Sequence, residues 1–198
     1  MPEAQPVIII LAAGKGERFR AGGGTTHKLE ALLAGKPVLQ HVLAAAQASG
    51  LPWHLVRPEG GTDGMGESIA LGVKATPDAA GWLILPGDLP LITAASLQRV
   101  VQALNEKPVV VPYYQQRHGH PVGFRREYFD ALVALSGDEG AKSIVQVARA
   151  RADVLTLALN DAGIVQDIDV PADLAAAEHD KKIAPYRFYE HIGEMRKI

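Results

Sequence analysis

The sequence contains no cysteine in its 198 residues. This absence excludes disulfide bonds, thiolate metal sites and a cysteine nucleophile. Long apolar segments are lacking too, since the longest run, from Val7 to Ala13, is too short to cross a bilayer. Residues 1–6 lack the basic start of a signal peptide. We therefore expect a soluble, cytoplasmic protein with no membrane partner.

A marked excess of charge of one sign is also missing. The 20 Lys and Arg residues nearly balance the 22 Asp and Glu residues, which gives a formal net charge of −2. Nucleic-acid-binding domains usually present a strongly basic surface, so this balance argues against nucleic acid as a partner. The hydrophobic fraction of 47% is ordinary for a globular chain long enough to bury one core.

Short apolar runs alternate with segments of helical periodicity along the chain. We expect strands at 7–11, 52–56, 82–86, 108–112 and 154–159, and helices at 36–49, 67–75, 94–105, 126–135, 142–150 and 171–179. Thr93 is a candidate N-cap, and a polar loop through Gly119 should follow the fourth strand. This alternation predicts an α/β fold with a mostly parallel sheet. Ligands bind beyond the carboxyl ends of such strands, so the turns after Leu11 and Leu85 should lie on one edge.

No internal repeat or linker divides the chain, and we expect a single domain over residues 1–180. Residues 181–198 mix charged residues with aromatic ones such as Tyr186 and Phe188. This tail, whose role the sequence does not assign, is compatible with a docking helix, a homodimer contact or an extension that is poorly ordered alone.

The turn after the first strand combines small residues with cations. Its small residues are Ala12, Ala13, Gly14 and Gly16, and its cations are Lys15 and Arg18, with Lys28 further along the loop. Small residues let backbone N–H groups approach an anion, and mobile cations complete what a triphosphate requires. The spacing matches neither a Walker A loop nor the dinucleotide fingerprint, because Phe19 stands at the third glycine position of the latter. The alternative is a tight strand-to-helix turn with incidental surface charge.

Two groups of aspartates are candidate metal ligands. Asp88 follows the strand 82–86 in a turn stiffened by proline and glycine, and Asp167 and Asp169 share one face of an extended segment. Mg²⁺ in phosphoryl-transfer sites is usually held by one or two carboxylates and by substrate phosphates. The alternatives are a turn in which Asp88 bonds its own backbone, and capping by Asp169 of a helix that begins at Pro171.

Together, short segments in a fixed order resemble the MobA-like nucleotidyltransferases, especially the branch of molybdenum cofactor cytidylyltransferases. They are Leu11-Ala-Ala-Gly-Lys-Gly-Glu-Arg18, Lys28-Leu29, Gly64-Met-Gly-Glu-Ser68, Gly87-Asp-Leu-Pro90, Gly119-His-Pro-Val122, Gly137-Asp-Glu-Gly-Ala141 and Asp167-Ile-Asp-Val-Pro171. Each segment is weak by itself, whereas the ordered set is specific and spans residue 7 to about residue 177.

The resemblance implies a three-layer α/β/α, Rossmann-like (GT-A-like) nucleotidyltransferase fold. It implies Mg²⁺-dependent transfer of a nucleoside monophosphate from a nucleoside triphosphate to a small phosphorylated acceptor, with release of pyrophosphate. CTP is the favoured donor, because Ala13 stands where guanylyltransferase relatives tend to have glycine. Molybdopterin or the molybdenum cofactor is the favoured acceptor, and a molybdoenzyme is then a candidate protein partner.

The resemblance also assigns roles to individual residues. Catalytic roles fall to Arg18, Lys28 and Asp88. Nucleotide binding falls to Leu11, Ala12, Ala13, Gly14, Lys15, Gly16, Gly64, Met65, Gly66, Ser68 and Gly87. The acceptor would face His120, Pro121, Asp138, Gly140 and Ala141, and Mg²⁺ would bind Asp88 and Asp169. Tyr113 and Tyr114, at the end of a strand, are candidates for stacking on an acceptor ring.

Several positions depart from the family pattern. The link between Arg18 and Lys28 is longer and richer in glycine than is usual, so the role of Lys28 requires the segment 20–27 to fold back. Val170 replaces a threonine, and Lys142 stands where arginine is common. These departures leave the acceptor open. One alternative is a sugar-phosphate or other small-phosphate nucleotidyltransferase, and another is a non-catalytic nucleotide- or cofactor-binding accessory protein for a molybdoenzyme.

Overall fold

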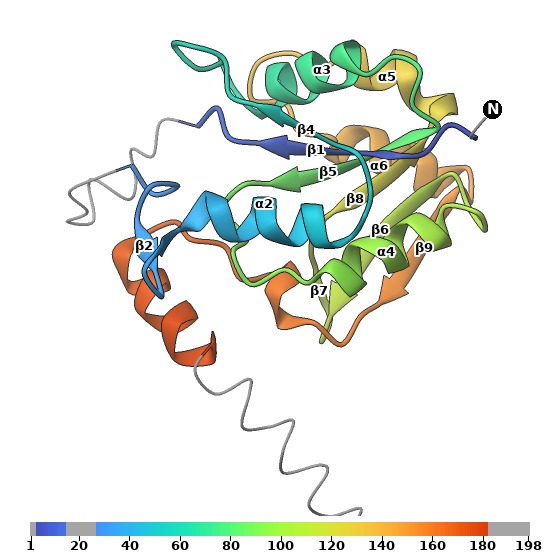
Figure 1. The fold of residues 1–198 in the computed structure, drawn as a ribbon. Coiled ribbons are helices and arrows are strands. Elements are labelled where there is room, and N and C mark those ends of the chain that lie inside the picture. The colour runs from blue at the N-terminus through green and yellow to red at the C-terminus, as the bar shows by residue number, and fades with distance from the viewer. Residues whose placement is uncertain (1–2, 15–26, 182–198) are drawn as a thin grey trace, which may run out of the picture.

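The structure, a computed structural model, describes residues 3–14 and 27–181 (Figure 1). Its centre is a seven-stranded sheet in which neighbouring strands follow the order β4-β1-β5-β8-β6-β7, with β9 paired to β6. The strands are β1 (Val7–Leu11), β4 (Trp53–Val56), β5 (Gly81–Pro86), β6 (Val109–Tyr114), β7 (Arg117–His118), β8 (Val122–Arg125) and β9 (Val154–Ala158). A separate pair joins β2 (Leu32–Leu33) to β3 (Lys36–Pro37).

Most of the large sheet is parallel, as the sequence predicts. β1 pairs in parallel with β4 and β5, and β6 pairs in parallel with β9. β8 lies between β5 and β6 and is antiparallel to both. The expectation of a polar loop through Gly119 is wrong in part, because β6 continues to Tyr114 and turns into the antiparallel strand β7. The sequence does not predict β8, since this strand is short and contains Gly123, which leaves no clear periodic pattern.

Helices cover both faces of the sheet and complete the expected three layers (Figure 1). One face packs against α2 (Val38–Ala48) and α4 (Ala94–Ala103), and the other packs against α3 (Met65–Ala75), α5 (Phe129–Val133) and α6 (Lys142–Ala150). Because successive side chains of a strand point to opposite faces, Ile8 and Ile10 join the first layer of core and Ile9 joins the second. This arrangement explains why β1 is apolar at every position.

Element boundaries differ from the expectations at several places. The expected helix 36–49 begins only at Val38, because Lys36 and Pro37 pair with β2. The expected helix 126–135 starts as the 3-10 turn η1 (Arg126–Tyr128) and continues as α5. Thr93 is confirmed as an N-cap, since its hydroxyl oxygen accepts a hydrogen bond from the Ser96 N–H. Residues 171–181 are helical, and a second 3-10 turn, η2, covers Ala162–Ile164.

The carboxyl ends of β1, β4, β5 and β6 meet at one edge of the sheet, called the carboxyl edge below. Hydrogen bonds fasten its turns together: Ala12 N–H donates to the Val56 carbonyl at 3.0 Å, and Gly87 N–H donates to the Leu11 carbonyl at 2.8 Å. Because β8 runs in the opposite direction, the residues that precede it reach the same edge. Within residues 3–14 and 27–181, no helix is long and apolar enough to cross a membrane.

Candidate functional site

The turn after β1 lies in the middle of the carboxyl edge. Ala12 and Ala13 are buried, and a methyl group at Gly61 would come 3.0 Å from the Ala13 carbonyl oxygen, so the loop after β4 crosses this turn closely. His27 contacts the Gly14 carbonyl oxygen through its Nε2 atom. The chain therefore returns to the β1 turn just before Lys28. Lys15, Gly16, Arg18 and the segment 20–26, all predicted to matter here, lie outside the described residues.

Lys28 and Asp88 form an ion pair at this edge. The Lys28 Nζ atom lies 2.9 Å from Asp88 Oδ2, and the two side chains are 19% and 17% exposed. Asp88 is placed by the turn after β5, where a methyl group at Gly87 would come 2.9 Å from the Leu11 carbonyl oxygen. The structure thus joins two residues that the sequence assigns catalytic roles and that are separated by 60 positions.

Asp88 lies near a second carboxylate, Asp167, which Asp169 and Asp173 also approach. The Ile168 N–H donates to the Asp88 carbonyl at 2.9 Å, which brings the segment 167–169 to the carboxyl edge. Burial raises the pKa of the Asp167 carboxyl, and the negative charge of Asp88 raises it further, with smaller contributions from Asp169 and Asp173. These carboxylates therefore repel Asp167, a condition that a bound cation relieves. In the described ranges, no group of three or more acidic or histidine side chains is arranged to hold a metal by itself.

Asp173 closes the start of the last helix. Its Oδ2 atom accepts hydrogen bonds from the N–H groups of Asp169 and Val170, both at 2.9 Å. The bond from the Val170 N–H to Asp173 is one half of a capping box, the half in which the third residue of the helix accepts from the N–H of the N-cap residue. The structure thus shows Asp173 as a capping side chain at the start of this helix, whereas the sequence pattern points only to Asp169 for that task.

His120 stands beside the same carboxylates. Its Nδ1 atom is shielded from solvent and has no hydrogen-bond partner within the described parts of the chain. Burial lowers the pKa of the ring, while the Asp88 charge, a hydrogen bond to the Ile84 backbone and the Asp167 charge oppose that shift. The backbone N–H of His120 donates to the Ile164 carbonyl at 3.0 Å. The imidazole is thus enclosed near Asp88, with Pro121 buried next to it.

The predicted nucleotide segment 64–68 packs against the predicted acceptor segment 138–141. Gly66 N–H donates to the Gly137 carbonyl at 2.9 Å, and a methyl group at Gly64 would come 2.2 Å from Asp138 Oδ1. Ser68 is buried and its hydroxyl donates to the Gly64 carbonyl at 3.0 Å, while Met65 is exposed. The loop holding Asp138, Gly140 and Ala141 therefore covers the start of α3, whereas His120 and Pro121 approach the edge in front of β8.

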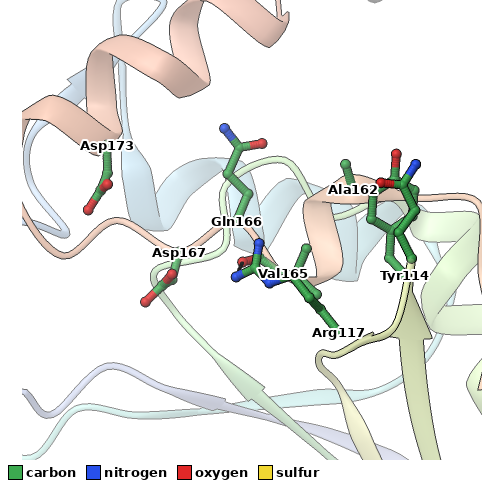
Figure 2. Close-up of a pocket in the computed structure, with 8 residues that line it drawn as sticks. Tyr114, Arg117, Ala162, Val165, Gln166, Asp167 and Asp173 are labelled. Carbon is green, nitrogen blue, oxygen red and sulfur yellow. Dashed lines mark hydrogen bonds between the residues drawn. The ribbon is translucent and has the colours of Figure 1, made fainter.

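An open pocket of about 370 Å³ lies at the β6 end of the carboxyl edge (Figure 2). The β6–β7 hairpin and the segment 162–173 form its walls, which are lined by Tyr114, Gln115, Arg117, Ala162, Val165, Gln166, Asp167 and Asp173. Asp167 links the pocket to the carboxylates around Asp88. Tyr114 is a candidate from the sequence, but Arg117 and Gln166 carry no signal there, since each stands beside other polar residues and matches no motif.

The family model described as the MobA-like NTP transferase domain matches residues 8–154. The chain belongs to this family. It is accordingly a nucleotidyltransferase, and its matched region runs from β1 to the first residue of β9. Asp167 and Asp169 lie beyond the match, and the structure brings their segment to the Asp88 turn through the hydrogen bond from the Ile168 N–H.

Curated relatives and solved structures agree with this assignment. The bifunctional protein GlmU of Xanthomonas euvesicatoria pv. vesicatoria (strain 85-10) is 32% identical over 145 residues, which cover 63% of this chain and 30% of GlmU. GlmU of Stenotrophomonas maltophilia (strain R551-3) is 31% identical over 183 residues, or 81% of this chain and 37% of its own. The chain thus spans about a third of the length of these relatives.

Two solved structures illustrate the shared fold. Rv0371c from Mycobacterium tuberculosis H37Rv superposes with a TM-score of 0.71 at 22% identity, covering 90% of this chain and 100% of that one. The molybdopterin-guanine dinucleotide biosynthesis protein A of Archaeoglobus fulgidus gives a TM-score of 0.61 at 15% identity, covering 89% and 98%. At these identities, the likeness to the two solved structures shows that the fold is shared and shows nothing about activity.

Proposed function

We propose that this nucleotidyltransferase transfers CMP from CTP to the phosphate of a molybdopterin-type acceptor in the presence of Mg²⁺. The observation that carries the proposal is the contact between Lys28 and Asp88 at 2.9 Å, beside the β1 turn and within a cluster of carboxylates. Triphosphate chemistry requires a cation, a metal-binding carboxylate and a close-packed turn at one place. Ala12, Ala13 and Gly14 supply the turn.

The residues at the carboxyl edge suit transfer by direct displacement. An acceptor phosphate oxygen would form a bond to the α-phosphorus of CTP, while the bond from that phosphorus to the bridging oxygen breaks and pyrophosphate leaves with the electron pair. An ionised acceptor phosphate needs no general base. Lys28 would stabilise the negative charge that develops on the α-phosphate. Asp88 and Asp169 would hold Mg²⁺, which neutralises charge on the phosphates when it is bound.

The identity of the metal fits the donor set at this edge. Carboxylate oxygens are the ligands that Mg²⁺ and Mn²⁺ prefer, and the segment that bears Asp167 and Asp169 meets the Asp88 turn at this edge. Rv0371c, a structural neighbour with a TM-score of 0.67, has been solved in complex with manganese. That neighbour supports a divalent ion without distinguishing Mg²⁺ from Mn²⁺.

The family resemblance and two structural neighbours support cytosine as the base of the nucleotide. The resemblance to the cytidylyltransferase branch supports a cytidylyl donor, because Ala13 stands where guanylyltransferase relatives tend to have glycine. CMP:2-keto-3-deoxy-manno-octonic acid synthetase, with a TM-score of 0.60, was solved with CTP bound. The other neighbour, from Anaerococcus prevotii, is a 4-diphosphocytidyl-2C-methyl-D-erythritol synthase with a TM-score of 0.64. The named activities belong to those proteins and support the choice of CTP only by analogy.

The acceptor would occupy the pocket in Figure 2, which opens next to Asp167. Tyr114 offers a ring for stacking, and Arg117 offers a guanidinium for phosphate or carbonyl oxygens. These groups suit a flat heterocycle that bears a phosphate. The second candidate acceptor is a sugar phosphate, favoured by the mixture of amide and carboxylate groups from Gln115, Gln166 and Asp167 in the same lining.

Pyrophosphate release measured with CTP, GTP, ATP and UTP, each with and without molybdopterin, tests this proposal. Release that requires both CTP and molybdopterin is the expected result. Release with CTP and a sugar phosphate, but not with molybdopterin, would select the second candidate. If CTP raises the melting temperature but no acceptor yields pyrophosphate, the accessory-protein alternative replaces the enzymatic one.

A further inference from the structure

Lys28 contacts the carboxylate that is proposed above to bind the metal. Its ammonium lies 2.9 Å from Oδ2 of Asp88, the carboxylate that would hold Mg²⁺ during transfer. We propose that Lys28 is a built-in cation that competes with the divalent metal for Asp88 until the nucleoside triphosphate arrives, so that metal and nucleotide bind cooperatively. The proposal deepens the function proposed above and rests on it, because it takes Asp88 as a metal ligand.

The charges around Asp88 explain why a cation is needed when no nucleotide is present. The Ile168 N–H donates to the Asp88 carbonyl at 2.9 Å, so the segment that bears Asp167 and Asp169 packs against the turn that bears Asp88. Partly buried carboxylates in such a cluster are destabilised unless a positive group accompanies them. Lys28 provides that group within the chain itself.

A metal ion bound to Asp88 would repel the Lys28 ammonium that contacts Oδ2. Each is positive, and charges of the same sign within a few ångströms repel strongly at a site screened from solvent. Lysine is suited to exchange partners, because its ammonium is a compact charge on a flexible stem. Lys28 must therefore leave Asp88 when the metal enters.

The backbone around Lys28 is held in place, so the exchange falls to the side chain. Glu30 N–H donates to the His27 carbonyl at 2.9 Å, and Leu39 N–H donates to the Leu29 carbonyl at 3.1 Å. His27 also contacts the Gly14 carbonyl oxygen. The triphosphate proposed to lie over this turn would offer Lys28 a second negatively charged partner. Nucleotide binding thus frees Asp88, and the metal that Asp88 then binds favours the nucleotide.

Mn²⁺ binding to the full-length protein without nucleotide, measured by electron paramagnetic resonance, tests the competition. Lys28→Met should bind Mn²⁺ about tenfold more tightly than the unmodified protein, because one repelling charge has been removed. Lys28→Arg keeps the charge and should leave the affinity weak. Lys74→Met removes the same charge from the exposed last turn of α3 and serves as the matched control. Adding Asp88→Asn to Lys28→Met should abolish the gain.

The proposal is overturned if Lys28→Met binds Mn²⁺ no more tightly than the unmodified protein, if neither protein binds it, or if Lys74→Met gives the same gain. A parallel thermal-shift titration of the unmodified protein with CTP and Mn²⁺ distinguishes failure of the Lys28 competition from failure of the proposed function. If CTP stabilises the protein but Lys28→Met binds Mn²⁺ no more tightly, only the competition between Lys28 and the metal is rejected. Absence of any effect of CTP rejects the proposed function as well.

Discussion

Lys181 Nζ lies 2.8 Å from Nδ1 of His41, a contact that joins the end of the last described helix to the first turn of α2. On its other side, the His41 ring contacts the Leu33 carbonyl at 2.7 Å through Nε2. A neutral imidazole satisfies both contacts, since Nε2–H donates to Leu33 while Nδ1 accepts from the lysine. Ala34 N–H also reaches Glu178. The helix that follows Asp169 is therefore fastened to the hairpin that follows Lys28.

Stability should fall with acidification because of His41. Burial lowers the pKa of His41 below its ordinary value of 6.5, with the Leu33 hydrogen bond opposing and Lys181 and Lys36 reinforcing the shift. As the pH falls below 6.5, the unfolded chain takes up the proton first, so the folded state loses stability down to the folded pKa. Urea unfolding between about pH 7.5 and 5.5 should show this decline, and a smaller one in His41→Gln. His120 has a lowered pKa too, but it is unchanged in the variant. Equal declines would contradict the assignment to His41.

Gly66→Ala should destabilise the fold. The added methyl would come 2.3 Å from the Glu139 carbonyl oxygen and 2.6 Å from that of Ser136, and both are backbone atoms. Separating α3 from this loop should cost about 1–3 kcal/mol of unfolding free energy, although alanine favours a helix more than glycine does. Denaturant unfolding measures the loss. Unchanged unfolding free energy would mean that the backbone of residues 136–139 can shift away from the added methyl group at little cost.

Gly14→Ala is the matched substitution without a clash. No atom lies within 4 Å of a methyl group at Gly14, so its unfolding free energy should stay within about 0.5 kcal/mol of the original. The methyl group would instead project where the triphosphate is proposed to approach the backbone, and CTP affinity should drop. Calorimetric titration with CTP measures that drop. Normal CTP affinity would argue for the alternative in which the turn has no role in phosphate binding.

Arg117→Met should affect the acceptor and spare the nucleotide. Arg117 lines the pocket, where its Nη2 atom donates to the Val165 carbonyl at 3.4 Å and leaves further N–H groups for a ligand. Loss of a charged hydrogen bond should raise the KM for the acceptor about tenfold, with the KM for CTP unchanged. Arg99→Met, at an exposed position of α4, is the control. Parallel changes in both KM values would place Arg117 outside the acceptor site.

Local patterns in the sequence predict much of the fold and part of the site. β1 and β5 are apolar runs that end in turns of small residues, and these features alone predict that the Gly14 and Asp88 turns share one edge of the sheet. The Lys28–Asp88 contact requires the chain to return after the glycine-rich link, which no local pattern specifies. The Asp173 cap, the His41–Lys181 contact and the pocket wall at Arg117 likewise depend on tertiary packing.

Pyrophosphate release by Asp88→Asn tests nucleotidyl transfer at Asp88 most directly. The substitution keeps the size of the side chain and removes its charge, so the fold should persist by circular dichroism. Asp78→Asn, at an exposed position, is the matched control. We predict that Asp88→Asn lowers kcat with CTP and acceptor at least about a hundredfold, while Asp78→Asn matches the unmodified enzyme. Near-normal turnover by Asp88→Asn would contradict the account.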